Sequence, residues 1–167
     1  LVSEAQVDVN KARRDDGATP LFIAAQQGHL EVVKFLASEA QADVNKAKID
    51  DGCTPVMIAA QEDHLEVVRF LASEAHADVN KAATDDGATP LFMAAQQGHI
   101  EVVRFLACEA LADVNKGKTD DGSTPVMIAA FQGHLEIVRF LVNEAQADVN
   151  KATTDAGATP VMIAAQE

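Results

Sequence analysis

The stretch Asp15–Ile49, DDGATPLFIAAQQGHLEVVKFLASEAQADVNKAKI, sets the pattern of the whole chain. It returns with a period of 35 residues as Asp50–Thr84, Asp85–Thr119 and Asp120–Thr154. The second and fourth units share 26 of 35 positions, far more than composition alone would produce. A period in this range predicts a solenoid, in which each unit buries its apolar surface against its neighbours.

Each unit carries signals for two helices. Thr-Pro follows the turn glycine in all five copies, and Thr54-Pro55 is followed by the apolar run Val56–Ala60. Threonine accepts a bond from a free N–H at a helix start, and proline needs no donor there. A Gly-His pair ends the first helix, with Asp63 in place of glycine in the second unit. A second helix is predicted over Leu30–Glu39.

The motifs Thr-Pro, Ala-Ala, Gly-His, Val-Val-x-Phe-Leu and Ala-Asp-Val-Asn, at these offsets, closely resemble the ankyrin repeat. The resemblance covers the whole chain. It implies an all-α ankyrin-repeat solenoid, with antiparallel helix pairs stacked in a curved array and turns projecting as fingers. The expected division is a single array over 1–167: partial repeats 1–14 and 155–167, and full repeats 15–49, 50–84, 85–119 and 120–154.

This chain departs from the resemblance in three ways. The usual period is about 33 residues. Of the two extra residues here, one lies between Leu36 and Asp43 and the other between Asn45 and Asp50. The usual glycine before Ala-Asp-Val-Asn is replaced by Gln41, His76, Leu111 and Gln146. We expect the second helix to extend through that position. The usual histidine after Thr-Pro-Leu is replaced by Phe22, Met57, Phe92, Met127 and Met162, which predicts apolar contact there.

The net charge of −13 argues against nucleic acid and anionic membranes as partners. It favours basic partners weakly, and a solvated acidic surface that prevents aggregation is the stronger interpretation.

The longest apolar run, Val126–Phe131, is far shorter than the ~20 residues that cross a bilayer. Cys53 and Cys108 stand at different offsets, so no disulfide is expected. Two free cysteines, together with the absence of a secretion leader before Leu1, predict a cytoplasmic or nuclear protein.

Residues that carry chemistry elsewhere have structural explanations here. Four histidines stand one repeat apart: His29, His64, His99 and His134. Stacked helices lie about 8–10 Å apart, whereas zinc needs nitrogens at about 2.1 Å, so neighbours cannot share an ion. The Asp-Asp pairs predict turns, with an acidic rim as the minor alternative, and Asn45, Asn80, Asn115 and Asn150 predict loop hydrogen bonds. We expect no catalytic site, metal or cofactor.

The exposed offsets that vary between repeats are the candidates for partner binding. In the ankyrin family they line the concave face. The candidate residues are Phe131, Gln132, Ser123, Gln96, Gln97, Gln61, Glu62, Asp86 and Asp121. Phe131 stands where Gln26, Gln61, Gln96 and Gln166 stand in the other copies, so we expect this position to be open to solvent. Packing of its ring over Met127 or the next repeat is the alternative.

The sequence therefore predicts a non-catalytic scaffold that recognises a protein or peptide through its concave face and turn tips. A structural or self-assembling array is one alternative, and a regulatory segment of a larger protein is another. Leu1-Val2 begins inside a second helix, and Val161–Ala165 is a first helix without its partner. We expect frayed ends, or head-to-tail contacts between molecules that cover this apolar surface.

Overall fold

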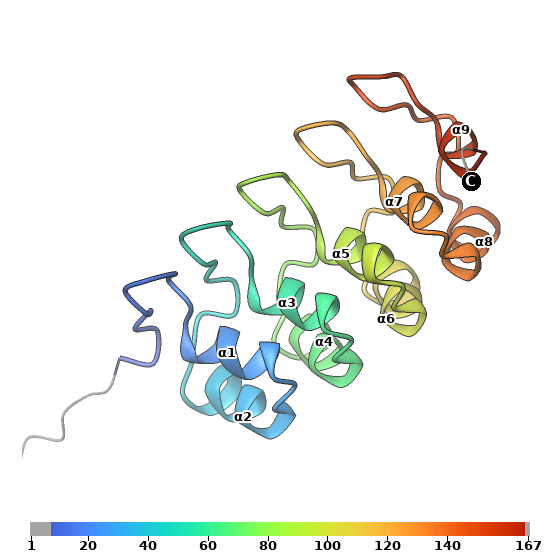
Figure 1. Cartoon of the computed structure of the whole chain (residues 1–167). Coiled ribbons are helices and arrows are strands. Elements are labelled where there is room, and N and C mark those ends of the chain that lie inside the picture. Colours follow the sequence, from blue (N-terminus) through green and yellow to red (C-terminus); the bar gives the residue numbers. More distant parts are fainter. Residues whose placement is uncertain (1–7, 166–167) are drawn as a thin grey trace, which may run out of the picture.

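The computed structural model describes residues 8–165, which form a row of helix pairs whose connecting turns all project to one side (Figure 1). The first helices of the pairs are α1 (Pro20–Gln26), α3 (Pro55–Gln61), α5 (Pro90–Gln97), α7 (Pro125–Phe131) and α9 (Pro160–Ala164). The second helices are α2 (Leu30–Lys34) with its continuation η1 (Phe35–Glu39), α4 (Leu65–Ser73), α6 (Ile100–Arg104) with its continuation η2 (Phe105–Glu109), and α8 (Leu135–Asn143). The expected all-α solenoid is confirmed.

The core runs along the row, because each first helix packs against the next. Paired alanines let these helices approach closely, and Ala25, Ala60 and Ala95 are fully buried. Larger side chains such as Leu91 and Val126 fill the space between the layers. The short first helices have too little length to be stable alone, so their stability comes from burial against neighbouring repeats.

The helix starts follow two different designs. Thr19 and Thr89 cap α1 and α5, each accepting a hydrogen bond from the backbone N–H three residues on, at 3.2 Å. The threonine hydroxyls that precede α3 and α7 make no cap hydrogen bond, contrary to the expectation from sequence. There the methionine in place of phenylalanine supplies an acceptor, and Met57 sulfur lies 3.3 Å from the N–H of Thr54. The sulfur accepts from the N–H of the threonine itself, whereas the hydroxyls of Thr19 and Thr89 accept from the N–H three residues on, so the two acceptors serve different donors.

The expectation that the second helix extends through the missing glycine is wrong. Gln41, His76, Leu111 and Gln146 all adopt left-handed backbone, with φ of 56°, 55°, 55° and 57°. The extra residue lies one turn earlier, where the N–H of Ala40 bonds to the carbonyl of Phe35, five residues back, at 3.0 Å. The N–H of Ala42 then bonds to Leu36, six residues back, at 2.8 Å. This is a Schellman-type helix end widened by one residue, and it still needs a left-handed residue to turn the chain.

The wider helix end is present in every full repeat. The same pair of bonds recurs as Ala75 to Phe70 with Ala77 to Leu71, as Ala110 to Phe105 with Ala112 to Leu106, and as Ala145 to Phe140 with Ala147 to Leu141. The 35-residue period therefore preserves the turn by inserting a residue into the last helical turn. Asp63 is also left-handed at φ 61°, which agrees with the expectation that aspartate takes the place of glycine there.

The projecting turns are held by bonds within each turn and between neighbours. Asp51 accepts the N–H of Cys53 through its side chain at 2.8 Å, and its carbonyl accepts the N–H of Thr84 from the next turn, also at 2.8 Å. Asn45 Oδ1 accepts the N–H of Asp78 at 2.9 Å. The roles expected for the aspartate pairs and the asparagines, as turn and loop formers, are confirmed in these contacts.

Two arginines on second helices contact aromatic rings of the following repeat. The guanidinium of Arg69 lies 4.6 Å from the ring centroid of Phe105 in the next repeat and 3.0 Å from Glu109. Arg104 repeats this contact over Phe140, also at 4.6 Å. These side chains tie successive second helices together, so the repeats are joined on both layers.

Candidate functional site

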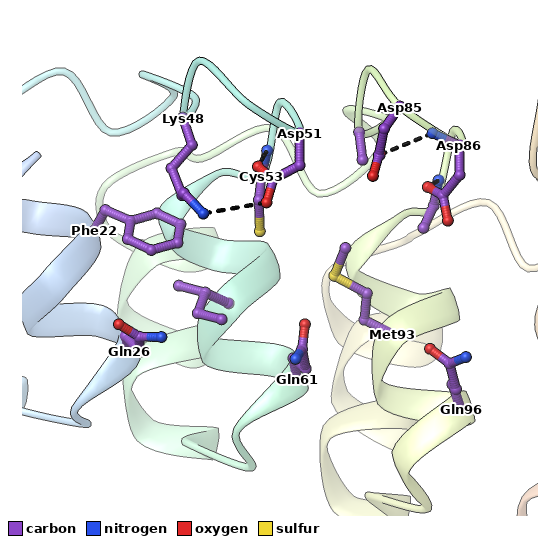
Figure 2. Close-up of a pocket in the computed structure, with 13 residues that line it drawn as sticks. Phe22, Gln26, Lys48, Asp51, Cys53, Gln61, Asp85, Asp86, Met93 and Gln96 are labelled. Carbon is purple, nitrogen blue, oxygen red and sulfur yellow. Dashed lines mark hydrogen bonds and ion pairs between the residues drawn. The ribbon is translucent and has the colours of Figure 1, made fainter. Parts of the chain in front are cut away.

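Residues of the projecting turns and of the first helices line two cavities along the row, and the surface that carries both is here called the inner groove. Its N-terminal part holds a cavity of about 370 Å³, the acidic cavity, which spans three repeats. Figure 2 shows carboxylates at the turn side and glutamine amides at the helix side. The lining residues are Phe22, Gln26, Lys48, Asp51, Cys53, Ile58, Gln61, Ala83, Asp85, Asp86, Ala88, Met93 and Gln96.

A half-buried lysine sits among these carboxylates. Lys48 Nζ lies 3.2 Å from Asp51 Oδ2 and 5.4 Å from the ring centroid of Phe22. Partial burial alone lowers the pKa of Lys48, but the hydrogen bond and charge of Asp51, with Asp16 and Asp50, outweigh it and raise this pKa overall. The lysine is therefore charged at neutral pH, and its charge is neutralised by Asp51.

Two repeats later, Lys118 occupies the equivalent position. Its Nζ lies 3.0 Å from Asp86 and 3.2 Å from Asp120, and 5.6 Å from the ring centroid of Phe92. Asp86 is thus paired, whereas Asp85 is exposed and has no ion pair within residues 8–165. Of the three carboxylates that line the acidic cavity, Asp85 is the one left for a ligand.

The histidines hold the helix ends that carry the groove side chains. Nε2 of His64 lies 3.0 Å from the carbonyl oxygen of Gln26, and Nε2 of His99 lies 2.9 Å from that of Gln61. His134 makes the same contact with Gln96 at 3.1 Å. Each donor comes from the repeat that follows its acceptor. This confirms the structural role expected for these three histidines, and it fixes the end of each first helix.

A second cavity, of about 220 Å³, opens further along the groove and is called the apolar cavity. It is lined by Asp121, Ser123, Met127, Ile128, Phe131 and Ile163. Phe131 is 61% exposed although Met127 beside it is buried. The position is open to solvent, as expected from the glutamines at the same offset. A small apolar group of a ligand in this cavity would contact Phe131 and Ile163.

The structure sorts the predicted partner-binding residues into these two cavities. The acidic cavity brings together Gln61, Asp86 and Gln96, and the apolar cavity brings together Ser123, Asp121 and Phe131. The remaining three candidates are exposed at the ends of the first helices and line neither cavity: Glu62, Gln97 and Gln132.

Sequence reasoning missed the two lysines of the groove. A signal was present in the alternation of two offsets: Lys48 and Lys118 occur in the repeats that carry Phe22 and Phe92, whereas the methionine repeats carry alanine or threonine instead. The sequence does not link the two offsets, because their relation becomes apparent only when the Lys48 ammonium is seen beside the Phe22 ring. The lining residue Asp85 was expected to form a turn, with an acidic rim as the minor alternative, and was not among the candidate binding residues.

The two cysteines lie in different surroundings. Cys53 is buried, and burial together with the charge of Asp51 raises the pKa of its thiol to about 12. Cys108 is exposed, and both are free. Within residues 8–165, no group of three or more histidine, cysteine or acidic side chains could hold a metal ion. No helix of that part is long and apolar enough to cross a membrane.

The two ends of the row expose apolar side chains. Val32 and Phe35 are 47% and 53% exposed at one end, and Val161 and Met162 are 65% and 59% exposed at the other. The segment Val161–Ala164 is helical. Leu1-Val2 lies outside the described residues. Fraying and head-to-tail contact stay predictions.

A model of the family described as ankyrin repeats (3 copies) matches residues 1–83, 41–118, 76–153 and 107–167, which together cover the chain. A search of curated proteins gave no match. Ankyrin repeats are generally protein–protein interaction modules, and the family is typically non-enzymatic. The stacked helix pairs, the recurring bonds between repeats and this match agree, and the chain belongs to the ankyrin-repeat family.

Proposed function

We propose that this chain is a non-catalytic recognition module that holds a protein partner in the inner groove, the concave face expected from the sequence. The observation that supports it most directly is Phe131, whose ring is 61% exposed beside a cavity of about 220 Å³. Aromatic side chains are enriched among the few residues that dominate binding energy at interfaces. A rigid row of repeats holds this ring in place before a partner arrives, which lowers the ordering cost of binding.

The acidic cavity extends the same surface over the neighbouring repeats. Asp85 has no cation partner within the described part of the chain, and Gln61 and Gln96 supply amide donors and acceptors on the opposite side (Figure 2). A partner with basic side chains fits this charge, in line with the weaker expectation from the net charge of −13. Nucleic acid and anionic membranes do not fit it.

The test uses two variants with the same change at different places. Phe131→Gln restores the residue that four of five repeats carry at that offset, so the free energy of unfolding should hardly change. Phe35→Gln removes a similarly exposed ring, 53% accessible, from a second helix outside the groove. Partners captured by the wild-type array would be identified, purified and titrated against all three proteins.

We expect Phe131→Gln to weaken binding by about 2 kcal/mol or more and Phe35→Gln to leave it unchanged. A partner bound equally well by the Phe131 variant would refute the groove as the site. A sharp loss of stability in that variant would assign the ring to packing instead. Turnover of any substrate by the purified array would contradict the non-catalytic part of the proposal.

Head-to-tail self-association is a second candidate, supported by one observation. Val32 and Phe35 are about half exposed, whereas the equivalent Val67 and Phe70 are buried by the preceding repeat. A molecular mass that rises with protein concentration, and falls back in Phe35→Gln, would support it. A constant monomer mass would refute it. A cytoplasmic or nuclear location remains a prediction, with which the two free cysteines are consistent.

A further inference from the structure

The acidic and apolar cavities are built from the same positions of the repeat, displaced by two repeats. Their common offsets are Asp51 and Asp121, Cys53 and Ser123, Ile58 and Ile128, Gln61 and Phe131, and Met93 and Ile163. The change of Gln61 to Phe131 makes the second cavity apolar where the first is amide-lined. The groove therefore offers two places at matching offsets, of about 370 Å³ and about 220 Å³, with different chemistry.

The acidic cavity is suited to a cationic side chain. Lys48 is already neutralised by Asp51 at 3.2 Å, and Asp86 by Lys118 at 3.0 Å. This leaves Asp85, whose exposed carboxylate lines the cavity and, among residues 8–165, accepts only the N–H of Asp86, at 2.8 Å. An arginine or lysine entering between the turns would restore charge balance there, with the side chain of Met93 as an apolar floor beneath its stem.

The apolar cavity is suited to a bulky apolar side chain. Its single carboxylate, Asp121, already accepts the N–H of Ser123 at 2.8 Å. Phe131, Ile128 and Ile163 form most of the remaining surface. Burying an aliphatic or aromatic group against the exposed face of Phe131 removes apolar area of both partners from water, which is the main source of binding energy at such contacts.

The repeat spacing bounds the distance between the two anchors. Matching offsets of the two cavities are two repeats apart, whereas the anchoring residues Asp85 and Phe131 belong to adjacent repeats. Stacked helices lie about 8–10 Å apart, so the two anchors are about 8–20 Å apart along the row. An extended chain advances about 3.3 Å per residue, so this distance corresponds to about three to six residues. Gln96, which lines the acidic cavity in the third repeat, can bond the backbone of a segment that crosses it.

We propose that the partner presents an extended peptide with a basic side chain in the acidic cavity and a bulky apolar side chain in the apolar cavity, about three to six residues apart. This rests on the proposed function, because it names the partner's chemistry at the same groove. It adds a register that a general protein-binding surface does not have.

The test is a selection from a library of random twelve-residue peptides against the array, followed by affinity measurement on the enriched peptides. A window of twelve residues accommodates the pair in either order. The wild-type selection should enrich arginine or lysine together with leucine, isoleucine, methionine or phenylalanine at this spacing. Selection on Phe131→Gln should lose the apolar residue and keep the basic one, and selection on Asp85→Asn should do the reverse.

On individual peptides, we expect Phe131→Gln to reduce affinity about tenfold or more and Asp85→Asn to reduce it about two- to fivefold, more at low salt. The control change Glu101→Gln, at an exposed position on a second helix, should leave affinity unchanged. Enriched peptides without the pair, or with the pair at random spacing, would overturn the proposal.

The two levels of the proposal fail in different ways. If no peptide is enriched while a folded partner still loses affinity in Phe131→Gln, the two-anchor peptide is refuted and the recognition groove stands. If enriched peptides and captured partners both ignore Phe131→Gln and Asp85→Asn, the groove itself is refuted.

Discussion

Replacing Leu111 by glycine should stabilise the protein, although it removes a large apolar residue. Leu111 is left-handed, with φ 55°, and its side chain is 77% exposed, so little burial is lost. The left-handed conformation costs a residue with a Cβ about 1–2 kcal/mol, and glycine avoids this cost. Glycine also gives the unfolded chain more freedom, which costs about 0.5–1 kcal/mol. The expected net gain is about 0.5–1 kcal/mol.

Leu111→Ala is the matched control, because it removes the side chain and keeps the Cβ that causes the strain. Its free energy of unfolding should stay close to that of the wild type. Both variants would be unfolded in urea, and the midpoint should shift upward for glycine with the slope unchanged. Leu111→Gly at or below the stability of Leu111→Ala would refute the account of the wider helix end.

The same reasoning extends to the other repeats. Gln41, His76 and Gln146 have the same φ within two degrees and are exposed. Effects at sites this far apart usually add. The four glycines together should therefore gain about 2–4 kcal/mol, four times the single value. A combined gain no larger than that of one site would show that the repeats share a strain that one substitution already relieves.

Three further changes test other contacts. Asp63→Gly should stabilise the protein by up to about 1 kcal/mol in thermal melts near pH 7.5, because φ at this position is 61°. Within residues 8–165 the change removes one contact with an ionisable side chain, that of Asp63 Oδ1 with His99 Nδ1 at 3.7 Å, and a loss of stability would mean that this contact matters more than the strain. Met57→Leu should cost about 1–3 kcal/mol in urea melts, because the N–H of Thr54 loses its sulfur acceptor, and a cost below that would show that the contact is weak. Partial burial alone raises the pKa of Asp120, but hydrogen bonds to its carboxylate and its ion pair with Lys118 lower this pKa overall. The stability that Asp120 contributes is therefore present above the unfolded pKa of 3.8 and is lost as the pH falls through the lower folded pKa. Urea midpoints between pH 2 and 5 should drop less steeply with falling pH for Asp120→Asn than for the wild type, and an identical pH dependence would contradict this.

Much of the fold follows from local patterns in the sequence. The period of 35 residues, the Thr-Pro helix starts and the Gly-His helix ends are local signals, and each corresponds to an observed helix boundary in the full repeats. The structural role of the histidines and asparagines also followed from the repeat, since a contact between neighbours recurs at a fixed offset. The exposure of Phe131 followed from the glutamines at the same position.

Other features depend on contacts that no single offset reveals. The backbone at Leu111 was misjudged because an extra residue can lengthen a helix or widen its last turn, and only the bonds from Ala110 and Ala112 decide between them. The pairing of Lys48 with Phe22 joins residues 26 positions apart, and the apolar cavity joins Phe131 to Ile163 of the next repeat. Local sequence determines helices and turns because their hydrogen bonds are short-range. The groove depends on how the repeats stack, and this decides which exposed residues share a cavity.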